Sequence, residues 1–414
     1  MSDRYTNPLS LTSQFYFCGL PLRLDSYRGC GFQCSFCFAR FRGGNAPQPN
    51  VIPANPGTLR RTLQGAFRET RPLGLIGQFL RRRVPVHFGG MSDPFQHAER
   101  TFQVTRKYLE VLRDFQYPTV ISTRSPMAAA DPYLGLLTEM KSVVVQFSFT
   151  STLADISRRL EPQSPPPGEL LDAMERLAGH GLVVTCRWQP YVRGQSEAPR
   201  QFVRRVAGAG ARHVAVEHLK LPIERAHPLW GNLVTACPHL WEEYAREGAR
   251  RDGREYVLPA RVKLPTVLEV RDATRQAGVS LGVADNDLQY LSDSDCCCSG
   301  VDQFPGFEGW FKHQVAHAVR LCRGRRITYG AIAGYWAPEG SVNRWLNSHS
   351  RVGILEEEGG SLENHIRLRW NDRNSPFSPA SFYGVVPTDY FTAAGFRLYT
   401  WQDDALAGIE PPVS

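Results

Sequence analysis

The chain has 414 residues, of which 42% are hydrophobic and 21% are charged, with a formal net charge of +8 at pH 7. This is the composition of an ordinary globular protein, which excludes a disordered chain, and the length suggests one large domain with an appendage or two to three domains. The chain shows neither an uninterrupted run of 18 apolar residues nor a basic start followed by an apolar run. We therefore expect no membrane span, no signal peptide and a cytoplasmic location.

Short β-like runs alternate with helical patterns between residues 22 and 222. This alternation is typical of parallel βα units, and six units are fewer than the eight of a full TIM barrel. We therefore predict an α/β fold, a partial (β/α)6 TIM-like barrel with a C-terminal α+β extension. The six runs are LRLDSY (22–27), VPVHFGG (84–90), PTVISTRS (118–125), SVVVQFSFT (142–150), LVVTCRWQP (182–190) and RHVAVEHLKL (212–221). Among the helical patterns, ERTFQVTRKYLEVLRDF (99–115) predicts an amphipathic helix.

The same patterns divide the chain into three parts. Residues 1–222 form the predicted barrel core. Residues 223–300 form a helical linker, helical over 223–275, with one further strand within GVSLGVADNDL (278–288) and a cysteine-rich group. Residues 301–414 form the extension, in which RLYTWQDD (397–404) predicts a strand. Parallel α/β folds place their ligand sites at the carboxyl ends of the strands, so we expect the chemistry there.

Three cysteines follow the first predicted strand: Cys30, Cys34 and Cys37, in the spacing C-x3-C-x2-C. Cytosolic thiols stay reduced, so we interpret these cysteines as ligands rather than disulfide partners. Thiolates bind zinc or iron–sulfur clusters, and a structural zinc site usually has two pairs of ligands. No fourth Cys or His lies near this trio in the sequence. The spacing therefore favours a [4Fe–4S] cluster with one open iron over a zinc site or unrelated buried cysteines.

The trio, with Phe36 just before its third cysteine, resembles the radical SAM superfamily. This resemblance implies that the cysteines hold a [4Fe–4S] cluster and that S-adenosylmethionine (SAM) ligates the open iron. It also implies reductive cleavage of SAM, with an electron donor such as flavodoxin or ferredoxin. The resulting 5′-deoxyadenosyl radical would abstract hydrogen from a substrate.

Further segments resemble the spore photoproduct lyase-like branch of this superfamily. They are YRGCGFQCSFCFAR (27–40), GGMSDPFQHAE (89–99), ISTRSP (121–126), the RLEP run (159–162) and RWQPYVRG (187–194). Arg124 stands where the branch usually has Lys, which puts any role of that Lys in doubt. The resemblance implies that the backbone of Gly89 and Gly90 binds the methionine amino group of SAM. It also implies cofactor-binding roles for Ser92, Asp93, Ser125, Ser148, Glu161 and Arg187.

Each of these side chains has a structural alternative. Ser92 and Asp93 also suit the cap of a helix, and Ser125 suits a turn before a proline. Ser148 lies on a strand face and Glu161 in a loop, where a solvated carboxylate is common. The planar guanidinium of Arg187 suits bidentate binding of a SAM carboxylate, but it also suits a structural ion pair.

A second cysteine group, Cys296, Cys297 and Cys298, lies within SDSDCCCSGVDQFPGFEGWF (292–311). The Gly, Phe and Trp around it predict a packed loop. Adjacent side chains diverge, so these three cannot easily bind one metal. Cys296 and Cys298 with Cys322 and Cys237 are candidates for an auxiliary iron–sulfur cluster. A catalytic thiol that returns a hydrogen atom to a product radical, or a purely structural role, are the alternatives. Cys18 and Cys186 suit the core.

The segment ITYGAIAGYWAPEGSVNRWLNS (327–348) predicts a helix, a turn and a second helix. In a helix-turn-helix, Ser341, Asn343 and Arg344 would face a groove or a phosphate. The basic charge also suits a nucleic acid, although a coding bias toward Arg explains it without any partner.

The leading hypothesis is a radical SAM enzyme, lyase-like or transferase-like, with nucleic acid as its first candidate substrate. Radical SAM modification of a small molecule or peptide is one alternative. The alternative from another class is a nucleic-acid-binding protein with a structural metal site.

Overall fold

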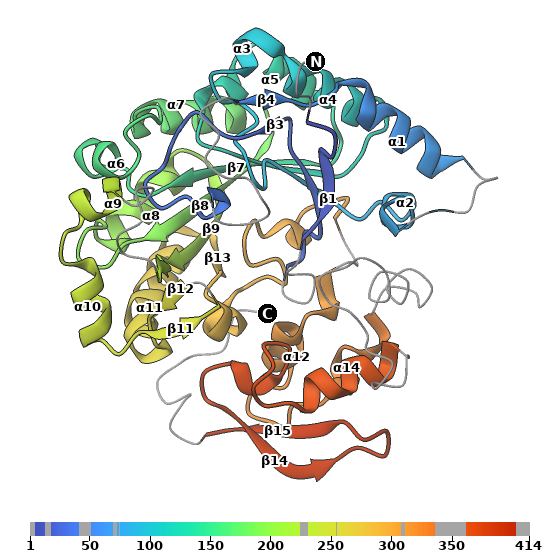
Figure 1. Ribbon diagram of the computed structural model, residues 1–414, viewed down its shortest axis with the longest axis vertical. Helices are drawn as coiled ribbons and strands as arrows, with labels where there is room; N and C mark the ends of the chain where they lie inside the picture. Colours follow the sequence, from blue (N-terminus) through green and yellow to red (C-terminus); the bar gives the residue numbers. More distant parts are fainter. Residues whose placement is uncertain are drawn as a thin grey trace.

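The computed structural model describes residues 5–12, 18–40, 51–68, 73, 75–223, 231–253, 255–307, 311–335 and 362–402. An eight-stranded sheet in the order β1-β2-β5-β6-β7-β8-β9-β13 forms its centre. Neighbouring strands from β2 to β13 are parallel, whereas β1 pairs antiparallel with β2 at one edge. The helices form an arc around the outside of this curved sheet (Figure 1). The predicted α/β fold with a partial TIM-like barrel is therefore confirmed.

Each of the six predicted β-like runs contains one strand of this sheet, and β13 within 278–288 adds a seventh parallel strand. One unit of the barrel therefore lies within residues 223–300, the part that we expected to be a linker with one further strand. The strands are β1 (Leu9–Leu11), β2 (Leu22–Leu24), β5 (Val86–Phe88), β6 (Thr119–Thr123), β7 (Val143–Phe149), β8 (Val183–Tyr191), β9 (Ala211–His218) and β13 (Ser280–Val283).

The central strands are buried on both faces because helices cover the outer face of the sheet. All five residues of β6 are buried. Along β7, Val145 and Phe147 belong to the main hydrophobic core, whereas Val144 belongs to a separate cluster. Alternate residues of one strand thus pack into different clusters, as the two-residue period of a strand requires. The helices of the barrel part are α1 (Gly57–Phe67), α2 (Leu75–Arg81), α3 (Glu99–Phe102), α4 (Val104–Asp114), α5 (Tyr133–Thr138), α6 (Ala154–Leu160), α7 (Pro167–Gly179), α8 (Pro199–Gly208), α9 (Gly231–Ala236), α10 (Leu240–Arg246) and α11 (Ala260–Ala277).

The helix predicted over 99–115 is broken in two at Gln103, which has a φ of 50°. The break follows from Glu99, whose buried carboxylate accepts hydrogen bonds from the backbone N–H groups of Thr105 and Arg106, both at 2.9 Å. These are among the first N–H groups of α4, which have no partner within the helix. A local pattern cannot show that a carboxylate from the preceding turn will cap a new helix start.

The segment 223–275 is only partly helical. Helices α9, α10 and α11 lie in it, but β11 (Arg250–Asp252) and β12 (Glu255–Val257) form a hairpin whose β12 also pairs with β10 (Leu221–Pro222). The helical prediction was wrong here because Asp252–Gly253 is a strong turn signal, and Gly253 adopts a positive φ of 59°.

The residues after β13 fold into the interior of the barrel; we call residues 292–307 the plug. Cys296 of the plug is buried in one cluster with Val120 and Val144, which lie near the start of β6 and β7. Gln146 of β7 donates a hydrogen bond to the carbonyl of Cys298. The plug therefore occupies the amino-terminal side of the strands, opposite the side where parallel folds place their ligands. This confirms that the cysteine-rich segment is a packed loop.

The C-terminal extension contains α12 (Val315–Leu321), α14 (Leu362–Asn371) and a hairpin of β14 (Val385–Phe391) and β15 (Arg397–Trp401), at the bottom of Figure 1. Strand β15 confirms the strand predicted in RLYTWQDD. Arg320 of α12 forms an ion pair with Asp295 of the plug, and this contact ties the extension to the barrel.

The predicted helix-turn-helix at 327–348 lies largely outside the described residues, Ser341, Asn343 and Arg344 included. Its described part forms two short 3-10 turns, at Tyr329–Ala331 and Ala333–Tyr335, in place of the predicted first helix. Glycine weakens a helix interior, and this stretch contains two glycines within seven residues.

Candidate functional site

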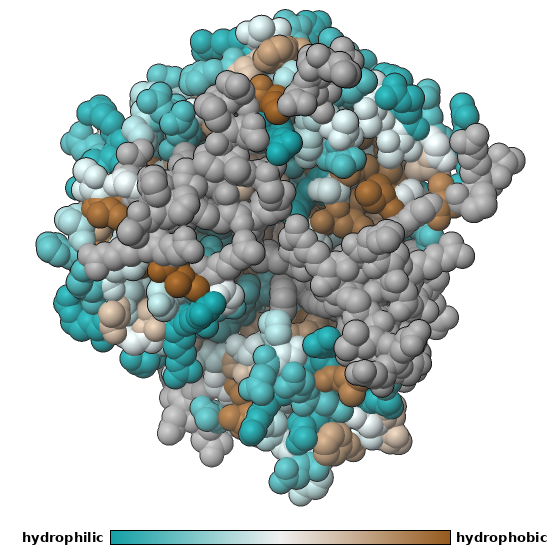
Figure 2. Space-filling view, viewed as in Figure 1, coloured by the Kyte–Doolittle hydropathy of each residue, from teal (hydrophilic) through white to brown (hydrophobic). Residues whose placement is uncertain are grey.

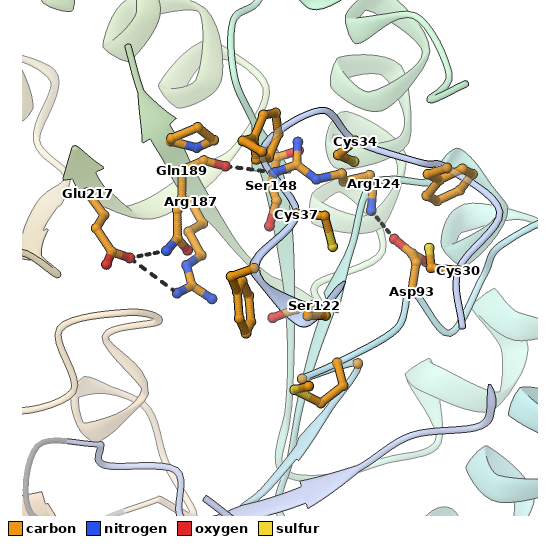
Figure 3. A pocket seen from close by; sticks show the side chains of 18 of the residues that line it. Cys30, Cys34, Cys37, Asp93, Ser122, Arg124, Ser148, Arg187, Gln189 and Glu217 are labelled. Atoms are coloured by element: carbon orange, nitrogen blue, oxygen red, sulfur yellow. Dashed lines mark hydrogen bonds and ion pairs between the residues drawn. The ribbon is translucent and has the colours of Figure 1, made fainter. Parts of the chain in front are cut away.

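A pocket opens where the parallel strands end, on the side opposite the plug (Figure 3). Its cavity measures about 240 Å³. The cysteine loop after β2 forms one wall, and residues at the ends of β5, β6, β7, β8 and β9 form the others. Nine of the predicted metal- and cofactor-binding residues line it: Cys30, Cys34, Cys37, Gly89, Gly90, Ser92, Asp93, Ser148 and Arg187.

The cysteine loop is held in place by its backbone. Gln96 accepts a hydrogen bond from the Gly31 N–H at 2.8 Å and donates one to the Gly29 carbonyl at 3.0 Å. The N–H of Ser35 donates to the carbonyl of Leu160 at 3.0 Å. A loop without regular structure thus presents its three thiols from fixed positions, with the ladder of β3 (Tyr27–Arg28) and β4 (Ile52–Pro53) beside it.

The three thiols are close enough to influence one another. Burial, the nearby Asp93 carboxylate and Cys37 raise the pKa of Cys30 to about 12. Burial also raises the pKa of Cys34, and Cys30 and Cys37 add to the rise while Arg124 opposes it. Among the described residues, no three Cys, His, Asp or Glu side chains are arranged to hold one metal ion. Thiolates are the usual ligands of iron–sulfur clusters, and in a four-iron cluster each thiolate binds its own iron, so the thiols of this loop are of a type that could hold such a group.

The Gly-rich segment after β5 is shaped by Asp25, a residue that the sequence analysis missed. Its buried carboxylate accepts hydrogen bonds from the N–H groups of Met91 at 2.8 Å and Ser92 at 3.0 Å. Burial raises the pKa of Asp25 to about 6, although these hydrogen bonds oppose the rise. Gly89 has a φ of 94°, and a Cβ there would lie 2.5 Å from the carbonyl of Ser122. Asp25 is a carboxylate inside the predicted run LRLDSY (22–27), and that position was the available signal.

Ser92 and Asp93 both make structural contacts within the site. The Ser92 hydroxyl donates to the carbonyl of Tyr27 at 2.7 Å. The Asp93 carboxylate accepts from the Thr123 hydroxyl at 2.9 Å and from the Arg124 N–H at 2.6 Å, joining the Gly-rich segment to the end of β6. Burial raises the pKa of Asp93 to about 6.

Arg124 lies beside the cysteine loop in the pocket; it is the residue for which the sequence resemblance led us to expect Lys. Its guanidinium pairs with Glu161 at 2.5 Å and donates to the carbonyl of Gln189 at 2.7 Å. It also lies over the ring of Phe36, 5.3 Å from the ring centre. Arg124 therefore connects the cysteine loop with α6 and β8. Glu161 reaches the site through this pair, and it is not among the residues that line the pocket.

Ser125 lies apart from the pocket lining as well. Its side chain accepts a hydrogen bond from the N–H of Met127 at 3.3 Å, which caps the 3-10 turn that follows β6. This contact matches the turn role that the sequence analysis gave as its alternative.

The opposite wall carries a cluster of charged and amide side chains around Glu217. Lys220 pairs with Glu217 at 2.8 Å, and Gln189 donates a hydrogen bond to the same carboxylate. The Arg187 guanidinium stands 3.7 Å from Glu217, and its Nε has no hydrogen-bond partner among the described residues. Figure 3 shows Glu217, Gln189 and Arg187 on the side of the pocket opposite Cys30. The sequence analysis found only Arg187, although Glu217 and Lys220 also lie within a predicted run, RHVAVEHLKL (212–221).

Three of the cysteines proposed for an auxiliary cluster are not brought together. Cys296 lies in the cluster inside the barrel, Cys322 in the main core and Cys237 in a third cluster beside α10. The three plug cysteines do not line the pocket either. Separate elements carry these side chains into separate cores, and a sequence spacing cannot reveal that. Cys186 is buried as expected, whereas Cys18 is only half-buried.

The thiol of Cys298 differs from its neighbours. Its sulfur lies 3.7 Å from that of Cys297, and this contact and the nearby Arg187 charge lower the pKa of Cys298 to about 7, against the effect of burial. Burial raises the pKa of Cys296. We therefore expect iodoacetamide to alkylate Cys298 with a rate that rises through pH 7 as the thiolate forms, while Cys296 stays unmodified.

Peptide mass spectrometry of anaerobic samples taken across pH 5 to 10 would measure both rates. Cys298→Ser removes the modified peptide and serves as the control. A midpoint for Cys298 near that of an ordinary thiol would show that Arg187 and Cys297 do not stabilise its thiolate.

No described helix is both long enough and apolar enough to cross a membrane. No family model matches the chain. An uncharacterized protein of Mycobacterium tuberculosis is 26% identical over 284 residues, which cover 63% of this chain and 80% of the relative. An uncharacterized protein of Methanocaldococcus jannaschii is 22% identical over 159 residues, which cover 38% of this chain and 56% of the relative.

Among solved structures, a variant of spore photoproduct lyase superposes with a TM-score of 0.50 at 16% sequence identity. The superposition covers 66% of this chain and 78% of that chain. A similarity at this level of identity concerns the fold. The chain therefore has the fold that is found in spore photoproduct lyase.

Proposed function

We propose that the chain is a radical SAM enzyme, which cleaves SAM reductively and abstracts hydrogen from a substrate. One observation carries the proposal: three thiols on one loop line the same pocket as a glycine pair, an acidic residue and an arginine whose Nε has no hydrogen-bond partner among the described residues. This pocket lies at the carboxyl ends of parallel strands, where such folds bind their ligands.

In this proposal Cys30, Cys34 and Cys37 hold three irons of a [4Fe–4S] cluster. A cluster held there would supply the electron that breaks the S–C5′ bond of SAM, which gives methionine and a 5′-deoxyadenosyl radical. The backbone of Gly89 and Gly90 binds the amino group of SAM. Glycine suits this position because the positive φ of Gly89 is a backbone conformation that residues with a side chain rarely adopt.

The polar side chains at the ends of β7 and β8 supply further groups that bind SAM. Arg187 binds a carboxylate, because its guanidinium lies at the pocket and makes no close hydrogen bond within the described residues. Ser148 contributes a hydroxyl from the neighbouring strand β7, where it is paired in register with Arg187 of β8. Asp93 and Glu161 orient the pocket walls through Thr123 and Arg124.

We propose a nucleic acid as the substrate class. The net charge of +8 supports it, since a basic protein attracts polyanions. Of the plug cysteines, Cys298 is best placed to return hydrogen, because its thiol lies near Arg187 on the plug side of the pocket. A small redox protein such as flavodoxin or ferredoxin supplies the electron.

The test uses protein purified and reconstituted without oxygen. Iron and sulfide are counted, the protein is reduced with dithionite, SAM is added, and 5′-deoxyadenosine is measured. We expect about four irons per chain and 5′-deoxyadenosine from the wild type, and neither from the variant with Cys30, Cys34 and Cys37 all changed to Ala.

A fully loaded wild type that makes no 5′-deoxyadenosine leads to a second measurement. Electron paramagnetic resonance of the reduced protein then shows whether SAM changes the cluster signal. An unchanged signal would mean that the metal is structural, and the enzyme proposal would be wrong.

A further inference from the structure

Two thiols of the plug are in contact inside the barrel. The sulfurs of Cys297 and Cys298 lie 3.7 Å apart, although the side chains of neighbouring residues usually diverge. By contrast, the residues coloured in the lower part of Figure 2 mix brown and tan with teal, as ordinary protein surfaces do. The proposed function uses only Cys298, so Cys297 is a buried thiol without an assigned role.

The backbone of this pair is fixed at both residues. The carbonyl oxygen of Cys297 lies 3.2 Å from Nε2 of His213, and the carbonyl of Cys298 accepts a hydrogen bond from Gln146. The amide of Gln289 also donates a hydrogen bond of 3.0 Å to the sulfur of Cys297. Groups from β9, from β7 and from the turn after β13 therefore hold the two sulfurs together.

The two thiols differ in exposure and in their tendency to ionise. Cys297 is buried, whereas Cys298 is half-buried. The contact with Cys297 and the charge of Arg187 lower the pKa of Cys298 to about 7, against the effect of burial, while the contact with Cys298 and burial raise the pKa of Cys297. A reactive thiolate thus lies beside a thiol that stays protonated, which is how an oxidisable cysteine and its resolving cysteine are arranged.

We propose that Cys297 and Cys298 form a redox-active pair, which hydrogen peroxide oxidises to a disulfide. The thiolate of Cys298 attacks one oxygen of the peroxide and breaks the O–O bond, which leaves a sulfenic acid and a hydroxide that takes up a proton. The sulfur of Cys297 then attacks the sulfur of Cys298 and displaces a second hydroxide, which takes up the proton of the Cys297 thiol. In sum, two thiols lose two electrons and two protons, and one peroxide becomes two water molecules.

This disulfide is expected to be readily reversible. Neighbouring Cα atoms are about 3.8 Å apart, which is less than the usual Cα separation across a disulfide, and a strained disulfide is easily reduced. The pairing itself does not depend on the proposed function, but its consequence rests on it, because Cys298 can return hydrogen only as a thiol. Peroxide would therefore stop hydrogen return reversibly, before Cys298 reaches the irreversible sulfinic state.

The test counts free thiols in the full-length protein, purified without oxygen and treated with hydrogen peroxide. The remaining thiols are then blocked with N-ethylmaleimide in denaturant, and the tryptic peptide 276–312, which contains Cys296, Cys297 and Cys298, is analysed by mass spectrometry. We expect this peptide to carry one maleimide after peroxide and three when dithiothreitol precedes the block. Cys297→Ser and Cys298→Ser should each abolish the disulfide.

Two matched controls come from neighbouring cysteines. Cys296, whose sulfur lies 3.3 Å from the hydroxyl of Ser299, and Cys18, whose ionisation is coupled to that of Cys298, are each changed to Ser, and both variants should still form the disulfide. Three maleimides on the wild-type peptide after peroxide would overturn the proposal, as would a sulfinic acid on Cys298 without a disulfide or a link from Cys298 to Cys18. Because the count needs neither cluster nor SAM, its outcome is independent of 5′-deoxyadenosine formation.

Discussion

Replacing Gly282 by Ala is expected to lower the free energy of unfolding by about 3 kcal/mol, at the upper end of the usual cost of overpacking. Gly282 lies on β13, where the plug passes directly over the strand. A Cβ at this position would lie 1.8 Å from the carbonyl oxygen of Cys297 and 2.5 Å from Nε2 of His213. These two atoms are themselves 3.2 Å apart and within hydrogen-bonding distance. Neither can move without breaking that contact, so the plug itself must shift.

The measurement is denaturant unfolding followed by tryptophan fluorescence. Gly135→Ala in α5 is the matched control, because a Cβ there meets nothing within 4 Å. The control is expected to gain about 0.5–1 kcal/mol, since Ala favours a helix over Gly. If Gly282→Ala is as stable as the wild type, the plug does not contact β13 as described.

Arg124→Met is expected to cost about 3–5 kcal/mol of unfolding free energy. The substitution leaves Glu161, which is 4% exposed, as a buried carboxylate without its counter-ion. The double variant Arg124→Met with Glu161→Gln should recover much of the loss, because the uncompensated charge is then gone. The same single change should also loosen the cysteine loop, which Arg124 contacts through Phe36.

Arg113→Met provides the control for this prediction. Arg113 pairs with Asp114 at 2.9 Å on the surface, where an ion pair contributes less than about 1 kcal/mol. Thermal unfolding of the four proteins gives the comparison. If Arg124→Met lowers the unfolding stability no more than Arg113→Met does, the ion pair between Arg124 and Glu161 is exposed to solvent.

These two predictions concern opposite ends of one barrel. The plug closes the amino-terminal side and supports the sheet from within, while Arg124 holds together the walls of the pocket at the carboxyl ends. A defect at either end reaches the pocket, since Gln146 and Arg187 stand on neighbouring strands between them. Stability and site geometry should therefore be measured on the same variants.

Part of this protein is determined by local sequence. The strands were predictable because a strand of a parallel sheet is buried on both faces and appears as a short apolar run. The cysteine loop was predictable because its three thiols lie within eight residues, so the chain cannot carry them far apart. Gly89, which has no room for a side chain, also lies at the end of the predicted run VPVHFGG (84–90).

The remaining features were decided by tertiary structure. Asp25 and Met91 are 66 residues apart, and Arg124 and Glu161 are 37 apart. A polar residue at a strand end has many potential partners, and only the order of strands in the sheet selects one. The separation of Cys237 and Cys322 from the plug has the same origin, since each follows its own helix into a different core. Local sequence thus determined the strands of the central sheet and the cysteine loop. Packing determined where several helices break and which side chains meet, because contacts between distant segments exist only once the sheet has formed.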